Sequence, residues 1–303
     1  MAWKQLRGPD LLSSLAAAPL ASIVLLSLAL GCKTAVPATD PEDPFSSTSL
    51  ALFENGLRPS NQRDWSPDLA VLPYAEFDGD LVTIHNIRNC VYVSDEDYVV
   101  NHYEKTFDQR DVETVDFIVV PFKEVPSLAH TMISFGFSNG DYLGVSVEAR
   151  LEQGETYSPM LGSLRQYELM YVVADERDLI VRRTKHRDVD VYLYRTIATP
   201  EQSGILFVDV MQRVNKLYHQ PEFYDTLTNN CTTNIARHVN RMRPGRLPYD
   251  LRILLPGLSD QLAYETGLLR REGTFAQTRK RAHINRLANR HAESGDFSAQ
   301  IRR

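Results

Sequence analysis

Cysteine and long apolar runs are both scarce in this sequence, and each scarcity excludes something. Only three cysteines occur, Cys32, Cys90 and Cys231, so the chain is not a disulfide-rich scaffold. No CxxC or HxxxH spacing occurs, so a metal site is not expected. Beyond residue 32 the longest apolar runs, such as 117–122 and 205–208, are far shorter than the about 20 residues of a membrane helix. We expect a protein without metal or other cofactor and without a membrane helix after residue 32.

The N-terminal 32 residues have the layout of an export signal. Lys4 and Arg7 precede an apolar stretch over 11–30 that stops at Gly31-Cys32. The ending LALGC resembles a bacterial lipobox, in which Cys32 receives diacylglycerol and becomes the mature N-terminus. An uncleaved membrane anchor is the alternative, because Ala29 stands where leucine is usual. Residues 1–32 are therefore predicted to be a lipoprotein signal peptide, and Lys33 is expected to permit sorting to the outer membrane.

The rest of the chain divides by composition into a tether, a domain and a tail. Residues 33–49 are rich in Pro, Thr, Ser and acidic residues, which cannot order themselves. Residues 50–255 are predicted to form one domain, supported by a 43% hydrophobic content. Residues 256–303 are predicted to be a helical basic tail, which carries nine basic against three acidic residues from position 270 onward. That tail is either a solvated helix or a contact for anionic lipid headgroups.

The first half of the predicted domain is rich in strands. Short runs of Val, Ile, Tyr and Phe between polar turns indicate β-strands over 81–196. Asn139-Gly140 is typical of a tight hairpin, so the strands on either side should be antiparallel neighbours. The predicted strands are VTIHNI, CVYVS, VDFIVVPF, HTMISFGF, YLGVSVEAR, YELMYVVA, LIVRR and VDVYLYRT.

Helices follow the strands. Thr199-Pro200-Glu201-Gln202 forms a capping box, and the apolar spacing after it predicts a helix that ends near His219. A second helix is predicted after Asn230, with Pro244-Gly245 as its stop. The fold class is therefore α+β, with an antiparallel sheet packed against helices.

Cys231 is the residue best placed for covalent chemistry. It lies where the loop TNN becomes a helix, and the positive end of a helix favours a thiolate. His130, at the start of a predicted central strand, is the candidate base. Either Ser146 or Glu148 could orient its imidazole. If Asn139-Gly140 is a two-residue turn, His130 faces Ala149, whereas a three-residue loop brings Glu148 to the His130 side.

Other arrangements of these residues are open at this stage. In an oxidising compartment Cys90 and Cys231 could form a structural disulfide. His85 and Cys90 could form a rival dyad, although both are expected to be strand and turn residues. We predict that Cys90 is reduced and packs as a small apolar residue.

Four long strings in the chain resemble the Lnb N-terminal periplasmic domain family. The resemblance covers Arg58 to about Leu255, and the strings begin at Arg58, Ala129, Tyr157 and Pro221. It implies a circularly permuted papain-like or NlpC/P60-like thiol enzyme, in which the histidine precedes the cysteine along the chain. The motif residues of that family fall on His130 and Cys231, with Glu148 as the third.

The resemblance also implies a reaction. The cysteine would attack an acyl ester of a diacylated lipoprotein and form a thioester, and the acyl group would then pass to an amine. Asn229, Asn230, Thr232 or helix-start N–H groups would stabilise the oxyanion. The implied partners are membrane lipid or an acylated lipoprotein, and a membrane protein could assist. No nucleic-acid partner is expected.

Three functions are compatible with these observations. The leading hypothesis is a lipid-anchored periplasmic Cys-His acyltransferase or hydrolase. The second is a cell-wall peptidase or amidase of NlpC/P60 type, and the third is a non-catalytic lipoprotein that binds acyl chains or acts as a scaffold. An apolar cleft would favour acyl substrates, and a polar, charged cleft would favour wall peptides.

Overall fold

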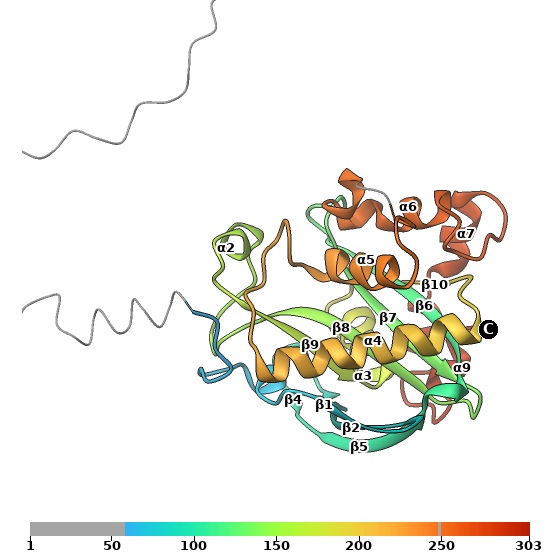
Figure 1. The fold of residues 1–303 in the computed structure, drawn as a ribbon. Coiled ribbons are helices and arrows are strands. Elements are labelled where there is room, and N and C mark those ends of the chain that lie inside the picture. The colour runs from blue at the N-terminus through green and yellow to red at the C-terminus, as the bar shows by residue number, and fades with distance from the viewer. Residues whose placement is uncertain (1–57, 248–249) are drawn as a thin grey trace, which may run out of the picture. The chain divides into compact units, whose positions relative to one another are not determined.

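The computed structural model describes residues 58–247 and 250–303. The described residues belong to one compact unit (Figure 1). The predicted signal peptide, the lipobox with Cys32 and the tether lie outside them. Within them, no helix is both long and apolar enough to cross a membrane.

A mixed sheet forms the centre of the unit. Its strands run in the order β1-β2-β9-β8-β7-β6-β10, and β5 also pairs with β2. Every pair in the sheet is antiparallel except β2 with β9, which is parallel at a single bridge. The α+β class is confirmed, whereas the expected antiparallel sheet is mixed. The strands are β1 (Tyr74–Asp78), β2 (Leu81–Arg88), β5 (His102–Asp108), β6 (Val112–Pro121), β7 (Ala129–Phe137), β8 (Tyr142–Arg150), β9 (Glu168–Ala174) and β10 (Tyr192–Arg195).

The hairpin between β7 and β8 sets the register of the site. Gly140 takes a φ of 85°, and its N–H donates to the carbonyl of Phe137, which gives a three-residue loop over 138–140. Met132 therefore pairs with Ser146. Continued along the strands, this register puts Glu148 opposite His130 and on the same side of the hairpin. A two-residue turn would have turned Glu148 away.

The two predicted long helices form where expected. α4 (Pro200–His219) begins at Thr199 with both hydrogen bonds of a capping box. It buries the predicted face, including Leu206, Val210 and Val214. α5 (Cys231–Met242) begins directly after Asn230, which also forms a capping box. Both helices lie on the same face of the sheet, α4 against β1, β6 and β9 and α5 against β7 and β8 (Figure 1).

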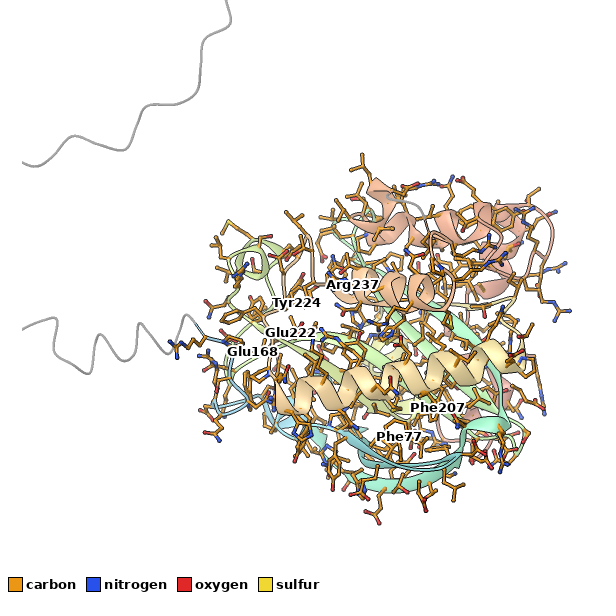
Figure 2. The ribbon with its side chains drawn as sticks, in the orientation of Figure 1. Phe77, Glu168, Phe207, Glu222, Tyr224 and Arg237 are labelled. Carbon is orange, nitrogen blue, oxygen red and sulfur yellow. The ribbon has the colours of Figure 1, made fainter. Side chains whose placement is uncertain are left out.

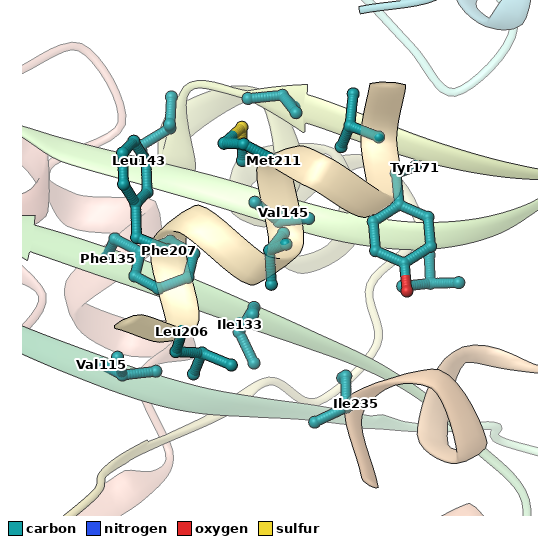
Figure 3. Packing of buried hydrophobic residues seen from close by; sticks show 14 of the residues in the cluster. Val115, Ile133, Phe135, Leu143, Val145, Tyr171, Leu206, Phe207, Met211 and Ile235 are labelled. Atoms are coloured by element: carbon teal, nitrogen blue, oxygen red, sulfur yellow. The ribbon is translucent and has the colours of Figure 1, made fainter. Parts of the chain in front are cut away.

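The core between α4 and the sheet is dense with aromatic rings. Phe207 of α4 is fully buried and meets Phe135 and Phe137 edge to face, with ring centroids 5.3 and 5.6 Å apart (Figure 3). Val145 and Met211 fill the adjoining space. Close contact of this kind fixes α4 on the sheet and, with it, the position of the neighbouring α5.

One predicted strand is wrong. The run LIVRR forms the end of α3 (Glu176–Val181) and the start of a π-helix, η3 (Arg182–His186). Leu179, Ile180 and Val181 are all buried against the second face of the sheet. A short apolar run has the same sequence pattern in a buried strand and in a buried helix. Here Glu176 and Asp178 in the first turn favour the helix, because acidic side chains stabilise its N-terminal end.

The C-terminal segment is packed onto the domain. It contains short helices that pack against β6, β7, β10 and α3. Arg302 forms ion pairs with buried Asp116 and Glu176. These helices are η5 (Pro256–Leu258), α6 (Ser259–Glu265), α7 (Phe275–Ala282), α8 (Asn285–Arg290) and α9 (Phe297–Gln300).

The remaining elements are short and border the sheet. β3 and β4 form a separate two-stranded ribbon. α2 lies in the connection from β8 to β9, and η4 follows α5 along the chain. Their bounds are η1 (Pro67–Leu69), β3 (Val91–Tyr92), β4 (Tyr98–Val99), η2 (Gln109–Asp111), α2 (Pro159–Ser163) and η4 (Leu251–Ile253).

Candidate active site

Cys231 occupies the first turn of α5. Asn230 accepts a hydrogen bond from the N–H of Thr233 at 2.8 Å, and Thr233 Oγ1 accepts one from the N–H of Asn230 at 2.8 Å. This reciprocal cap fixes the backbone on both sides of the cysteine. Cys231 is 4% exposed, and its Sγ lies 3.9 Å from the carbonyl oxygen of Ala129, the residue before His130. The sulfur is thus brought to the start of β7.

His130 is backed by a hydrogen-bonded chain of polar side chains. Its Nε2 lies 2.6 Å from Ser146 Oγ, and Ser146 Oγ donates to Glu148 Oε1 at 2.6 Å. The imidazole nitrogen and the carboxylate oxygen are 3.3 Å apart. Glu148 and Ser146, which the sequence offered as alternatives, therefore act on the imidazole together.

Arg183 completes this chain from the π-helix. Its guanidinium donates to Glu148 Oε1 at 3.0 Å and to the carbonyl of Leu179 at 2.8 Å. The side chain is 5% exposed, so this pair is largely shielded from water. Arg183 was not among the predicted site residues, because the run LIVRR resembles a strand and only the π-helix directs this side chain toward Glu148.

The electrostatics of the site favour a charged sulfur. Burial opposes the thiolate, but a hydrogen bond and charge from His130 lower the pKa of Cys231 to about 7. Burial likewise opposes the imidazolium, but the carboxylate of Glu148 and the contact with Cys231 raise the pKa of His130 to about 9. Between these values the pair exists mainly as thiolate and imidazolium. Burial acts against ionisation of Glu148 too, yet His130 and Arg183 hold its pKa well below its usual range.

The pair opens into a cavity of about 700 Å³. Around Cys231 the wall is apolar or aromatic, and it includes Phe122, Leu128 and Tyr224. The far end carries paired charges, among them Arg182, whose guanidinium lies 2.9 Å from the carboxylate of Asp95. The cavity can therefore take an apolar group next to the sulfur and a polar group further away.

The three side chains predicted for the oxyanion site are engaged elsewhere. Asn229 donates to the carbonyl of Phe223 at 2.8 Å, and it is not part of the cavity wall. Asn230 lines the cavity but its amide donates to Thr226 at 2.6 Å. Thr232 is hydrogen-bonded to Thr131 at 3.1 Å. The backbone N–H groups at the start of α5 are the better donors, since a helix has no internal acceptor for its first turn.

The alternative arrangements of cysteine do not form. Cys90 and Cys231 are both free and buried. Cys90 donates its backbone N–H to Asp178 at 2.8 Å, and burial raises the pKa of its thiol to about 11. His85 stacks on Tyr74 with ring centroids 4.4 Å apart, so it does not form a dyad with Cys90. The described residues hold no cluster of three His, Cys, Asp or Glu side chains suited to a metal ion.

The family comparison decides the class of this domain. The model of the Lnb N-terminal periplasmic domain matches residues 99–257, which include His130, Glu148 and Cys231. The chain belongs to the Lnb N-terminal periplasmic domain family. The resemblance found in the sequence is confirmed, and the family's description places the chain in the periplasm or cell envelope.

The match to the Lnb family spans only part of the folded unit. Strands β1 and β2, which extend the sheet past β9, precede the matched range, and α6 to α9 follow it. No curated protein and no solved structure matches the chain. The permuted papain-like topology therefore stays a prediction.

The two pKa values predict how the thiol responds to pH. Alkylation of Cys231 by iodoacetamide should rise with pH through about 7, because the thiolate is the nucleophile, whereas Cys90 should stay unreactive below about pH 9. His130→Ala removes the positive partner, so the pKa of Cys231 should rise and alkylation at pH 7 should fall about tenfold. Peptide mapping by mass spectrometry measures both rates. His85→Ala is the control, and an unshifted profile in His130→Ala would contradict the pairing.

Proposed function

We propose that this protein is a thiol-dependent acyl-transfer enzyme of the cell envelope that acts on acyl esters of lipoproteins or related envelope lipids. The observation that carries the proposal is the position of Cys231 at a helix start next to the beginning of β7, where Ser146 and Glu148 hold the imidazole of His130. A thiolate that opens into a cavity whose wall is partly apolar and aromatic is suited to attack an acyl carbonyl. Membership of the Lnb family supports the same class of substrate.

In the first step the thiolate of Cys231 attacks the ester carbonyl. A C–S bond forms, and the tetrahedral oxyanion receives hydrogen bonds from the backbone N–H groups of Cys231 and Thr232. The C–O bond to the alcohol then breaks, and the departing oxygen takes a proton from the imidazolium of His130. The products are a thioester on Cys231 and a lysolipid or lyso-lipoprotein alcohol.

In the second step an acceptor attacks the thioester. His130, now neutral, removes a proton from an amine or from water as the new C–N or C–O bond forms. The C–S bond breaks and the thiolate of Cys231 is restored. Glu148 and Ser146 hold the imidazole in one orientation through both steps, and Arg183 keeps Glu148 charged. An amine acceptor gives a transferase and water gives a hydrolase.

A second candidate is cleavage of an amide bond in a cell-wall peptide. The observation in its favour is the charged far end of the cavity, where Arg182 pairs with Asp68 and Asp95. A peptide with charged side chains would find partners there. The chemistry at Cys231 would be the same, with an amine as the leaving group in place of an alcohol.

Trapping of the covalent intermediate tests the proposal. The protein is incubated with a diacylated lipopeptide or with a wall-type peptide, quenched in acid and analysed by intact mass and peptide mapping. We expect an acyl adduct on the Cys231 peptide that neutral hydroxylamine removes, as a thioester requires. His130→Ala should lower the rate of adduct formation by about 10²-fold or more. A peptidyl adduct would favour the amidase, and no adduct from either substrate would refute both.

A further inference from the structure

Two pairs of segments without charged residues, here called the two lips, contribute to the wall of the cavity that contains Cys231. The first lip consists of residues 156–164, which include α2, and residues 226–229. The second lip consists of residues 125–128 and 253–258. None of these residues is Asp, Glu, Lys or Arg, whereas 24% of the whole chain is charged. Charged side chains stand at the borders of the lips, as Arg165 does after the first, and the guanidinium of Arg237 in α5 contacts Thr228 and Asn229 of the first lip.

Each lip is a pair of segments joined by hydrogen bonds. In the first, Thr226 Oγ1 donates to the carbonyl of Pro159 at 2.8 Å. In the second, the N–H of Gly257 donates to the carbonyl of Ser127 at 2.9 Å, and a Cβ at Gly257 would collide with this backbone. Both lips contribute to the cavity wall that contains Cys231, through Pro159 and Thr226 on one side and Leu128, Leu254 and Pro256 on the other.

The lips expose large apolar side chains to solvent. Three leucine or methionine side chains of the first lip are more than half exposed, Met160 71%, Leu164 71% and Leu227 54%, and Leu251, two residues before the second lip, is 75% exposed. Val125, Leu161, Leu255 and Leu258 add smaller exposed areas on the same segments. Several exposed apolar side chains on segments that line a cavity mark a surface that is covered in use.

We propose that the two lips dock into the hydrocarbon boundary of a phospholipid bilayer, so that the enzyme takes its acyl ester directly from the membrane. This proposal rests on the proposed function for its substrate. The unbranched and γ-branched apolar side chains of the lips match acyl chains, and the residues of the lips themselves offer no charged partner to a wall peptide. In a bilayer the ester bonds of the lipids lie at the upper end of the acyl chains. Lips that enter the acyl-chain region would therefore bring the cavity close to these ester bonds.

The start of the described chain agrees with this orientation. Gln153, shortly before the first lip, donates its N–H to the carbonyl of Asp64 at 2.7 Å, so the N-terminal segment enters beside that lip. The predicted lipid attachment site, Cys32, lies 26 residues before Arg58. A chain of that length spans at most about 90 Å when extended, which is ample for the domain to meet the membrane that holds the anchor.

Depth-dependent fluorescence quenching tests the docking. Tryptophan is placed at Leu164 or Leu255. Trp3 is replaced by phenylalanine in any preparation that retains the predicted signal peptide, and the signal of the buried Trp65 is subtracted as a constant background. Phe77→Trp is the matched control, since Phe77 is 41% exposed and lies far from Tyr224 at the cavity (Figure 2). In vesicles of phosphatidylethanolamine and phosphatidylglycerol, brominated acyl chains should quench Leu164→Trp and Leu255→Trp by about half, because docked side chains sit about 5–10 Å deep. The Phe77→Trp signal should change by less than about a tenth.

Two outcomes would overturn the docking proposal. Equal quenching at all three positions, or none at the lips, would show that the lips do not enter the bilayer. Shielding of the lip tryptophans from acrylamide without vesicles, together with a dimer mass in sedimentation, would show that a second copy covers them. The quenching is also measured in Cys231→Ala, so the test of docking does not depend on enzymatic activity.

A paired activity measurement separates docking from catalysis. Leu164→Glu with Leu255→Glu should lower turnover of a diacyl ester in vesicles at least about tenfold and leave turnover of a short-chain, water-soluble ester within about twofold. Loss on both esters would contradict a role confined to docking. If the wild-type protein turns over neither ester, the proposed function fails while the quenching result stands.

Discussion

Replacing Cys231 by alanine should abolish acyl transfer, with a loss of about 10³-fold or more in kcat, and leave the fold intact. The sulfur is the only atom in the proposed mechanism that bonds to the acyl group, so no neighbouring side chain can replace it. The stability cost should be about 1 kcal/mol or less, because one buried sulfur is removed and the cap at Asn230 does not involve it. Turnover of a diacylated lipopeptide and the thermal midpoint measure the two effects.

Cys90→Ala is the control for this prediction. Cys90 is also buried and free, and its thiol has a pKa of about 11. The substitution should therefore leave turnover within about twofold while it removes a comparable volume from the interior. If Cys231→Ala kept full turnover, the thiol mechanism would be wrong and a binding or scaffold role would take its place.

The positions of Cys231 at a helix start and His130 on a strand could be predicted from the sequence because they depend on local features. Cys231 follows a capping residue, and helix starts are recognisable from short patterns. His130 opens a strand that β-branched and aromatic residues define well. The position of Glu148 needed one further fact, the length of the hairpin loop. Asn139-Gly140 suits a two-residue or a three-residue connection, and only the positive φ of Gly140 within a three-residue loop settles the register.

The rest of the site could not be predicted because it depends on tertiary contacts. Arg183 reaches Glu148 only because Leu179 and its apolar neighbours form a buried helix that continues as a π-helix. The hydrophobic periodicity and the composition of a short apolar run do not distinguish a buried helix from a buried strand. The side chains predicted for the oxyanion site have other hydrogen-bond partners for a related reason. Asn229 and Asn230 stabilise the loop and the cap themselves, and side chains that cap a helix are not free to bind substrate.

In the sheet too, features that depend on neighbouring residues could be predicted, and features that depend on contacts between distant segments could not. Strand β5 was missed because His102, Glu104 and Lys105 make it look like a polar loop, although its alternate residues pack on the sheet. The parallel bridge between Arg88 of β2 and Ala174 of β9 joins segments more than eighty residues apart. No short pattern signals such a contact, so the expectation of an antiparallel sheet was the natural one.

Arg302→Met should destabilise the protein by about 3–5 kcal/mol, although the residue stands next to the end of the chain. Its guanidinium donates to Asp116 at 2.8 Å and to Glu176 at 2.8 Å, and both carboxylates are almost fully buried. It also lies 3.8 Å from the ring centroid of Tyr142. Methionine retains part of the stacking but removes the cation that the two buried carboxylates share, so that Glu176 loses its ion pair and Asp116 keeps only Arg195, 2.9 Å away.

Urea unfolding with Arg303→Met as the matched control measures this effect. Arg303 is the adjacent residue, its side chain is 67% exposed, and its nearest acidic partner, Asp296, is 4.0 Å away, so its substitution should cost almost nothing. The penalty for Arg302→Met should also shrink between pH 7 and pH 5. Without the arginine the pKa values of the buried carboxyls of Asp116 and Glu176 rise, and a neutral carboxyl tolerates burial better than a charged one. Equal, small losses in both variants would show instead that the C-terminal helices are held by apolar packing alone.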